Sequence, residues 1–169
     1  IIGLPCRKII RVRSQRVTVE HAGEIVETLD CPDPLAWIQE FQARYRVPVT
    51  GEGLPRFIGG LVGYFSYDTI RYVESKLAHC PNPDPVDNPD ILLLVSEDMV
   101  VFDNLAGRLY LITLVDPAVE RAYSRAQQRL DDWSELLRSP RSLYAPYRPH
   151  PAAREIEFVS GFTQDGFEN

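Results

Sequence analysis

Two short runs of alternating apolar and polar residues constrain the fold of this chain more than any other feature. Residues 8–13 read Lys-Ile-Ile-Arg-Val-Arg and residues 16–20 read Arg-Val-Thr-Val-Glu, with Ser14-Gln15 between them. Alternation with a period of two places the apolar side chains on one face of a strand, and a two-residue connection is typical of a β-hairpin. The start of the chain therefore predicts an antiparallel hairpin with one buried face.

Other apolar runs predict further strands. Residues 91–95 are apolar throughout, which is typical of a strand that is covered on both faces. A turn at 104–107 joins the next two runs as a second, longer hairpin. The expected strands after the first hairpin are 24–29, 59–66, 91–95, 99–103 and 108–115.

Asp-Pro pairs mark the starts of two predicted helices. An Asp side chain caps the first turn of a helix. Proline is tolerated at the first helical position because the N–H that it lacks would have no partner within the helix there. Asp33-Pro34 opens a helix that ends at Val47, because the residue before proline is pushed out of the helical region. Asp116-Pro117 opens a longer helix, and Asp68 is expected to cap a short one at 69–74. The expected apolar stripes are Leu35, Trp37, Ile38, Phe41 and Tyr45 in the first helix and Val119, Ala122, Tyr123, Ala126, Leu130, Trp133 and Leu137 in the long one.

Hairpins with helices packed on one face predict an α+β fold with a mainly antiparallel sheet. At 169 residues, 44% of them hydrophobic, the chain is long enough to bury one sizeable core. We expect one domain over 1–138, a linker rich in proline and arginine over 139–160, and the first residues of another domain over 161–169. Because the chain opens without Met and stops as a helix begins at Thr163, we expect a fragment.

The net charge argues against a nucleic-acid partner, and the short apolar runs argue against a membrane-spanning segment. A charge of −6 with scattered basic residues argues against nucleic-acid binding, which depends on clustered Lys and Arg. No segment approaches the roughly 20 apolar residues that span a bilayer. Cys6, Cys31 and Cys80 lie too far apart to indicate a disulfide framework or a metal knuckle. We expect a soluble, cytoplasmic protein with reduced thiols, no membrane contact and no nucleic acid.

Candidate catalytic and metal-binding groups are few. His21, His79 and His150 each lack a second ligand at metal-binding spacing, so they are interpreted as solvated surface residues. The carboxylate pairs at 97–98 and 131–132 are adjacent in sequence, so their side chains diverge. We assign no catalytic, cofactor-binding or metal-binding residue to this chain.

Glycines and tyrosines concentrate at 59–72. Three glycines in one predicted strand need a reason, such as close approach of a neighbouring backbone or ring. A phosphate loop is not that reason, because the spacing fits no Gly-x-Gly-x-x-Gly and no Gly-Lys-Ser/Thr pattern. We interpret the cluster as a domain interface with hydrogen-bonded tyrosines, with a small-molecule contact as the alternative. Its residues are Gly59, Gly60, Gly63, Tyr64, Tyr67, Asp68, Arg71 and Tyr72.

The same cluster carries a resemblance to a known family. Residues 57–68, read as Phe-Ile-Gly-Gly-Leu-Val-Gly-Tyr-Phe-Ser-Tyr-Asp, and the following Arg71-Tyr72-Val73-Glu74 closely resemble an element of the amino-terminal region of anthranilate synthase component I. The resemblance also covers Ile1-Ile2-Gly3-Leu4-Pro5, Asn88-Pro89-Asp90-Ile91, residues 100–104 and residues 162–169, and it is weaker over 138–160. Residues 162–169 look like the opening of the first helix of the family's chorismate-binding domain.

The resemblance implies a role in a larger enzyme. The complete protein is expected to convert chorismate to anthranilate and pyruvate in tryptophan biosynthesis, with Mg²⁺ and with ammonia from a glutamine amidotransferase subunit. Tryptophan is the expected feedback inhibitor. The family's catalytic and Mg²⁺-binding residues and its tryptophan-site motifs match no position here, so this part is expected to be an inactive, structural and regulatory neighbour of its own chorismate-binding domain.

Two alternatives remain open from the residues alone. The aminodeoxychorismate synthase large subunit of the folate pathway is a near relative with a similar glycine-rich element, although the Asn-Pro loop and Arg71-Tyr72-Val73-Glu74 favour the anthranilate branch. An independent, non-enzymatic binding module of the same fold is the other alternative.

Overall fold

The structure, a computed structural model, describes residues 6–47, 53–79, 87–139 and 163–168. Residues 1–137 form one compact unit, and 138–169 form a second. The second unit contributes the short helix α3 (Gln164–Glu168), whose Gly166 N–H donates to Thr163 Oγ1 at 3.2 Å. A helix therefore begins at Thr163 as predicted. The linker from residue 140 onward, His150 and Cys80 lie outside the described residues.

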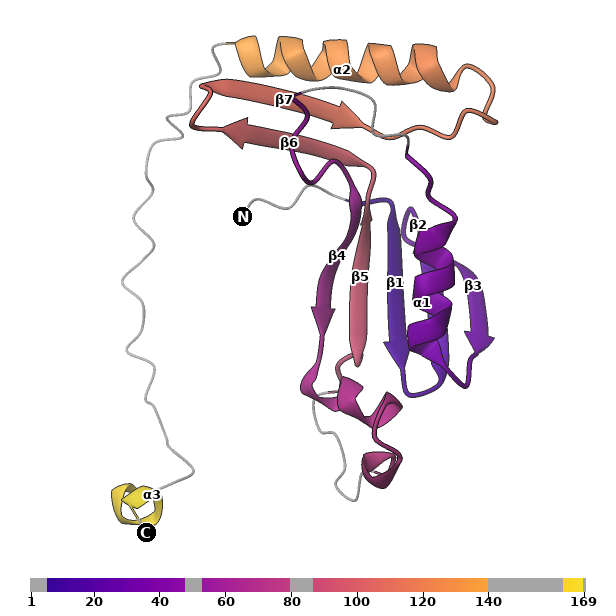
Figure 1. The fold of residues 1–169 in the computed structure, drawn as a ribbon, viewed down its shortest axis with the longest axis vertical. Coiled ribbons are helices and arrows are strands. Elements are labelled where there is room, and N and C mark those ends of the chain that lie inside the picture. The colour runs from indigo at the N-terminus through magenta and orange to yellow at the C-terminus, as the bar shows by residue number, and fades with distance from the viewer. Residues whose placement is uncertain (1–5, 48–52, 80–86, 140–162, 169) are drawn as a thin grey trace, which may run out of the picture. The chain divides into compact units, whose positions relative to one another are not determined.

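A five-stranded antiparallel sheet is the centre of the first unit. Its strands lie in the order β3-β2-β1-β5-β4, so the chain's first hairpin is extended on one side by β3 and on the other by the later strands (Figure 1). The pairing of Val12 with Val17 confirms the predicted hairpin register around Ser14-Gln15. The strands are β1 (Lys8–Arg13), β2 (Arg16–His21), β3 (Glu24–Asp30), β4 (Gly60–Phe65) and β5 (Ile91–Ser96).

Helix α1 (Pro34–Ala43) covers one face of this sheet (Figure 1). Asp33 Oδ1 accepts a hydrogen bond from the Ala36 N–H at 2.9 Å, which confirms the predicted cap. The helix ends at Ala43 rather than at Val47, since the amides of the next two residues donate to carbonyls three residues back and close the last turn tightly. The core joins Trp37, Ile38 and Phe41 of α1 to Ile10, Val12, Val17, Val19, Ile91, Leu93 and Val95 of the sheet.

Strand β5 corrects one prediction about burial. Its alternate residues Ile91, Leu93 and Val95 are buried against the α1 side, whereas Leu92 and Leu94 on the other face are only half-buried. The expectation that both faces are covered is therefore wrong for the described residues, which cover one face fully and the other in part.

A second, two-stranded sheet follows β5 directly. It pairs β6 (Asp98–Asp103) with β7 (Arg108–Thr113) in antiparallel register, as the predicted second hairpin requires. The long helix α2 (Ala122–Arg138) runs along this hairpin (Figure 1). Its stripe is confirmed in part, because Ala126 is buried and Ala122, Leu130 and Trp133 are half-buried while Tyr123 and Leu137 are exposed.

Two predicted helix starts are wrong. Asp116-Pro117 does not open α2: Asp116 Oδ1 accepts from the Ala118 N–H within a turn, and Arg121 at φ 58° interrupts the chain before Ala122. The segment after β4 forms the 3₁₀ helices η1 (Tyr67–Tyr72) and η2 (Ser75–Leu77). Asp68 lies inside η1 and binds Arg71 instead of capping a helix.

None of the helices in the described part of the chain is both long enough and apolar enough to cross a membrane.

Candidate functional site

The predicted glycine–tyrosine cluster begins at Gly59, directly before β4, and continues along β4 and the following η1. Strand β4 lies at an edge of the sheet. The three glycines differ in how closely neighbouring atoms approach the position where a Cβ would lie. A Cβ at Gly63 would lie 1.9 Å from the Leu92 carbonyl oxygen on β5, and one at Gly59 would lie 2.4 Å from the Leu114 side chain. Gly60 is less crowded, with the Phe57 ring 3.4 Å from an added Cβ, but its φ of 140° disfavours other residues. A neighbouring backbone therefore approaches β4 most closely at Gly63.

Tyr72 ties three segments together at the end of the sheet. Its hydroxyl lies 2.7 Å from the Ser14 carbonyl oxygen and 2.7 Å from Asp90 Oδ2. Asp90 also accepts a hydrogen bond from the Ser14 N–H at 2.7 Å. Burial raises the pKa of the Tyr72 hydroxyl well above its ordinary value of 10.0, and the hydrogen bond to Asp90 and the charge of that carboxylate raise it further. Tyr72 thus stays protonated and links η1, the first hairpin and the start of β5.

The other polar residues of the cluster make local contacts. Arg71 donates to Asp68 at 2.8 Å and to the carbonyl oxygen of Leu77 at 2.8 Å, which fixes η1 to η2. The Tyr64 hydroxyl donates to the Pro89 carbonyl oxygen at 3.1 Å. Tyr67 is 93% exposed and contributes no hydrogen bond to this network. The cluster is held together by local contacts and presents two exposed aromatic rings, Tyr64 at 41% and Tyr67 at 93%. Its predicted role as a domain interface stays a prediction.

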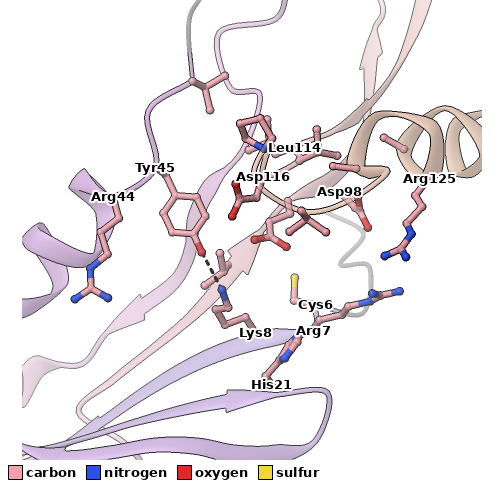
Figure 2. A pocket seen from close by; sticks show the side chains of 18 of the residues that line it. Cys6, Arg7, Lys8, His21, Arg44, Tyr45, Asp98, Leu114, Asp116 and Arg125 are labelled. Atoms are coloured by element: carbon pink, nitrogen blue, oxygen red, sulfur yellow. Dashed lines mark hydrogen bonds between the residues drawn. The ribbon is translucent and has the colours of Figure 1, made fainter.

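A cavity of about 630 Å³ lies elsewhere in the first unit, where the two sheets meet (Figure 2). Its walls come from the start of β1, the end of β2, the end of α1, the junction of β5 with β6, the turn after β7 and the first turns of α2. Figure 2 shows Lys8 and Arg7 on one side of the space and Asp116 and Asp98 on the other. The Lys8 ammonium donates to the Tyr45 hydroxyl at 3.0 Å.

The charge of this cavity is opposite to that of the chain. Six Lys and Arg residues line it against three carboxylates, although the whole chain carries a net charge of −6. One Arg is neutralised within the wall, because Arg129 Nη1 lies 2.9 Å from Asp98 Oδ2. The remaining basic residues are Arg7, Lys8, Arg44, Arg46 and Arg125, and the carboxylates are Glu97, Asp98 and Asp116.

This arrangement suits the binding of a polar or anionic group better than metal chemistry. Within the ranges that the structure describes, no three His, Cys, Asp or Glu side chains are placed to hold a metal ion. His21, interpreted from the sequence as a surface residue, is exposed and lies at the cavity wall. Sequence reasoning missed the cavity because its walls come from six separate segments, none of which carries a motif.

Comparisons with known proteins agree with one another. No protein-family model matches the chain. The chain is 54% identical over its full length to anthranilate synthase component 1 of Pseudomonas aeruginosa and 50% identical over its full length to that of Pseudomonas putida. Over 89% of its length it is 39% identical to the protein of the same name from Acinetobacter calcoaceticus. It spans about a third of the length of these curated relatives, 34%, 34% and 31% respectively.

A solved structure has the same fold. The crystal structure of anthranilate synthase component I from Streptococcus pneumoniae aligns with a TM-score of 0.60 at 23% sequence identity, covering 83% of this chain and 29% of that one. At this identity the likeness shows the fold alone. It confirms the predicted α+β class with mainly antiparallel strands, and the structure adds that the helices are few.

Proposed function

We propose that this chain, which is homologous along its whole length to the N-terminal part of anthranilate synthase component 1, works within the large subunit of an anthranilate synthase. The single observation that carries the proposal is the 54% identity that extends over the entire chain. The relatives described above all bear the anthranilate synthase name, which favours this branch over the aminodeoxychorismate branch.

In this proposal the complete protein converts chorismate to anthranilate and pyruvate in the cytoplasm, with ammonia supplied by a glutamine amidotransferase subunit. Mg²⁺ assists the reaction, and the family resemblance implies that the residues that hold the ion belong to the chorismate-binding domain. Tryptophan regulates the enzyme. The present chain packs on the catalytic domain, and it transmits inhibitor binding to that domain as a shift between two packing arrangements.

The test is an assay of the chain with and without the rest of the enzyme. The purified 169 residues, given chorismate, ammonium and Mg²⁺, are expected to produce no fluorescent anthranilate. A full-length polypeptide, matching the relatives in length, is expected to produce anthranilate and to be inhibited by tryptophan. Anthranilate formation by the chain alone contradicts the inactive-support role, and a full-length polypeptide that yields aminodeoxychorismate instead assigns the other branch.

A further inference from the structure

The two edges of the five-stranded sheet differ in chemistry. Strand β3 reads Glu-Ile-Val-Glu-Thr-Leu-Asp and carries three carboxylates, whereas β4 reads Gly-Leu-Val-Gly-Tyr-Phe and carries no charge and no proline. Proteins protect a free sheet edge with charges, prolines or bulges, because an unprotected edge presents N–H and C=O groups to any other strand. Strand β3 has its charges and a register shift beside Val19 and Glu20, while β4 has none of these protections.

Among the residues that the structure describes, apolar side chains on both faces of β4 are exposed. Register places Val62 and Tyr64 beside the half-buried Leu94 and Leu92, on the face away from α1. Val62 is 41% exposed, and Phe65 on the opposite face is 53% exposed.

We propose that a β-strand from the part of the relatives' polypeptide that this chain lacks pairs with the free edge of β4 and extends the sheet. Two observations favour this occupant. The exposed edge offers main-chain hydrogen bonds that an extended segment satisfies. The chain spans only 34% of the length of the Pseudomonas aeruginosa relative, whose remaining length is large enough to contain such a strand. The incoming strand is uncharged and apolar where it faces β4, since a buried, unpaired charge there would be costly. This proposal rests on the proposed function, which supplies the longer polypeptide.

Hydrogen exchange measures the pairing directly. Alternate amides of β4 bond to β5, and the others point to the free edge. In the 169-residue chain the edge-facing amides of β4 and of β3 are expected to exchange quickly. In the full-length polypeptide those of β4 are expected to slow by about tenfold or more, and those of β3 to remain fast. Equal exchange of the β4 edge amides in both proteins overturns the proposal.

A matched pair of variants tests the same edge through stability. Val62→Lys on β4 and Val26→Lys on β3 alter side chains that are exposed in this chain, at 41% and 60%. Neither is expected to move the melting temperature of the 169-residue chain appreciably. In the full-length polypeptide Val62→Lys is expected to lower it clearly and Val26→Lys to leave it unchanged, and equal effects of the two variants there contradict the proposal.

Two further outcomes separate this proposal from its alternatives. If sedimentation shows that the 169-residue chain dimerises and its β4 amides slow with concentration, the occupant is a second copy and the proposal is wrong. If the full-length polypeptide makes anthranilate but leaves the β4 edge unprotected, the proposed function stands and only the strand pairing fails. If the β4 edge is protected but no anthranilate forms, the strand pairing stands and the proposed function fails.

Discussion

At Gly63 the requirement for glycine has a direct steric cause. An added Cβ would lie 1.9 Å from the Leu92 carbonyl oxygen, a separation that real Cβ atoms do not show, so β4 and β5 would have to move apart. Gly107, in the β6–β7 turn, differs because nothing lies within 4 Å of an added Cβ and its φ of 61° is tolerated by Asn. The two positions provide a matched comparison between a crowded glycine and a conformational one.

Gly63→Ala is therefore expected to destabilise the chain by about 1–3 kcal/mol, as overpacking typically does. Gly107→Asn is expected to cost under about 1 kcal/mol. Urea unfolding followed by circular dichroism measures both. If Gly63→Ala costs no more than Gly107→Asn, close approach of β5 is not the reason for this glycine.

Tyr72 makes stability depend on alkaline pH. The folded chain holds the phenol proton more tightly than the unfolded chain, whose pKa stays near the ordinary 10.0. The contribution of Tyr72 is complete below about pH 10 and is lost as the pH rises further, because the unfolded state then releases a proton that the folded state keeps.

We expect Tyr72→Phe to lower stability by about 1 kcal/mol at pH 8. The variant is also expected to lose less stability than the wild type between about pH 9.5 and 11, which brackets the ordinary tyrosine pKa of 10.0. Urea midpoints across this range measure the difference. Tyr64→Phe, which removes only the bond to the Pro89 carbonyl, is the control for loss of a hydroxyl. Parallel pH profiles for wild type and Tyr72→Phe would contradict the role given to this proton.

At the scale of secondary-structure elements, one partly buried ion pair fixes α2 to the β6–β7 hairpin. Arg129 Nη1 lies 3.0 and 2.9 Å from the two carboxylate oxygens of Asp98, and Thr113 Oγ1 donates to the same carboxylate at 2.6 Å. The two charged side chains are about a third exposed, at 33% and 30%. Solvent therefore screens this pair less than it screens the more exposed Arg16–Asp30 pair between β2 and β3.

A double-mutant cycle of Asp98→Asn with Arg129→Gln is expected to give a coupling energy of about 0.5–1 kcal/mol. The matched cycle is Arg16→Gln with Asp30→Asn, whose pair is 3.4 Å long and exposed at 66% and 79%. Its coupling is expected to be near zero. Equal couplings from thermal unfolding in the two cycles would show that burial does not strengthen the first pair.

At the scale of the whole molecule, the residues that bury the core are confined to the first unit. All ten members of the core cluster lie between Ile10 and Val95, and Ala126 is the further buried hydrophobic residue of the described chain. None of the residues that the structure describes after Arg138 belongs to this cluster. Folding stability is therefore expected to belong to the first unit.

A chain that ends at Arg138 is accordingly expected to unfold cooperatively with the same melting temperature as the 169-residue chain. Calorimetry on both proteins measures this. A fall of more than roughly 4 °C, about 1 kcal/mol for a domain of this size, would show that residues 139–169 stabilise the first unit and that the predicted boundary at 138 is misplaced.

Much of the local structure was predictable because it depends on neighbours in sequence. Alternation in 8–13 and 16–20 determined the hairpin and its buried face, and Asp33 with Pro34 determined where α1 starts. The same local rule failed at Asp116, since the left-handed backbone of Arg121 separates that cap from α2. Neither the cap nor the proline carries information about that interruption.

The sequence by itself therefore determined the strands, the first helix, the α+β class and the family resemblance of the glycine-rich segment. Only the tertiary structure decided which glycine is sterically required, that β4 lies at an edge, and that basic residues from distant segments line one cavity. These properties depend on which strands become neighbours, and that order is decided by the burial of one shared core rather than by any local pattern.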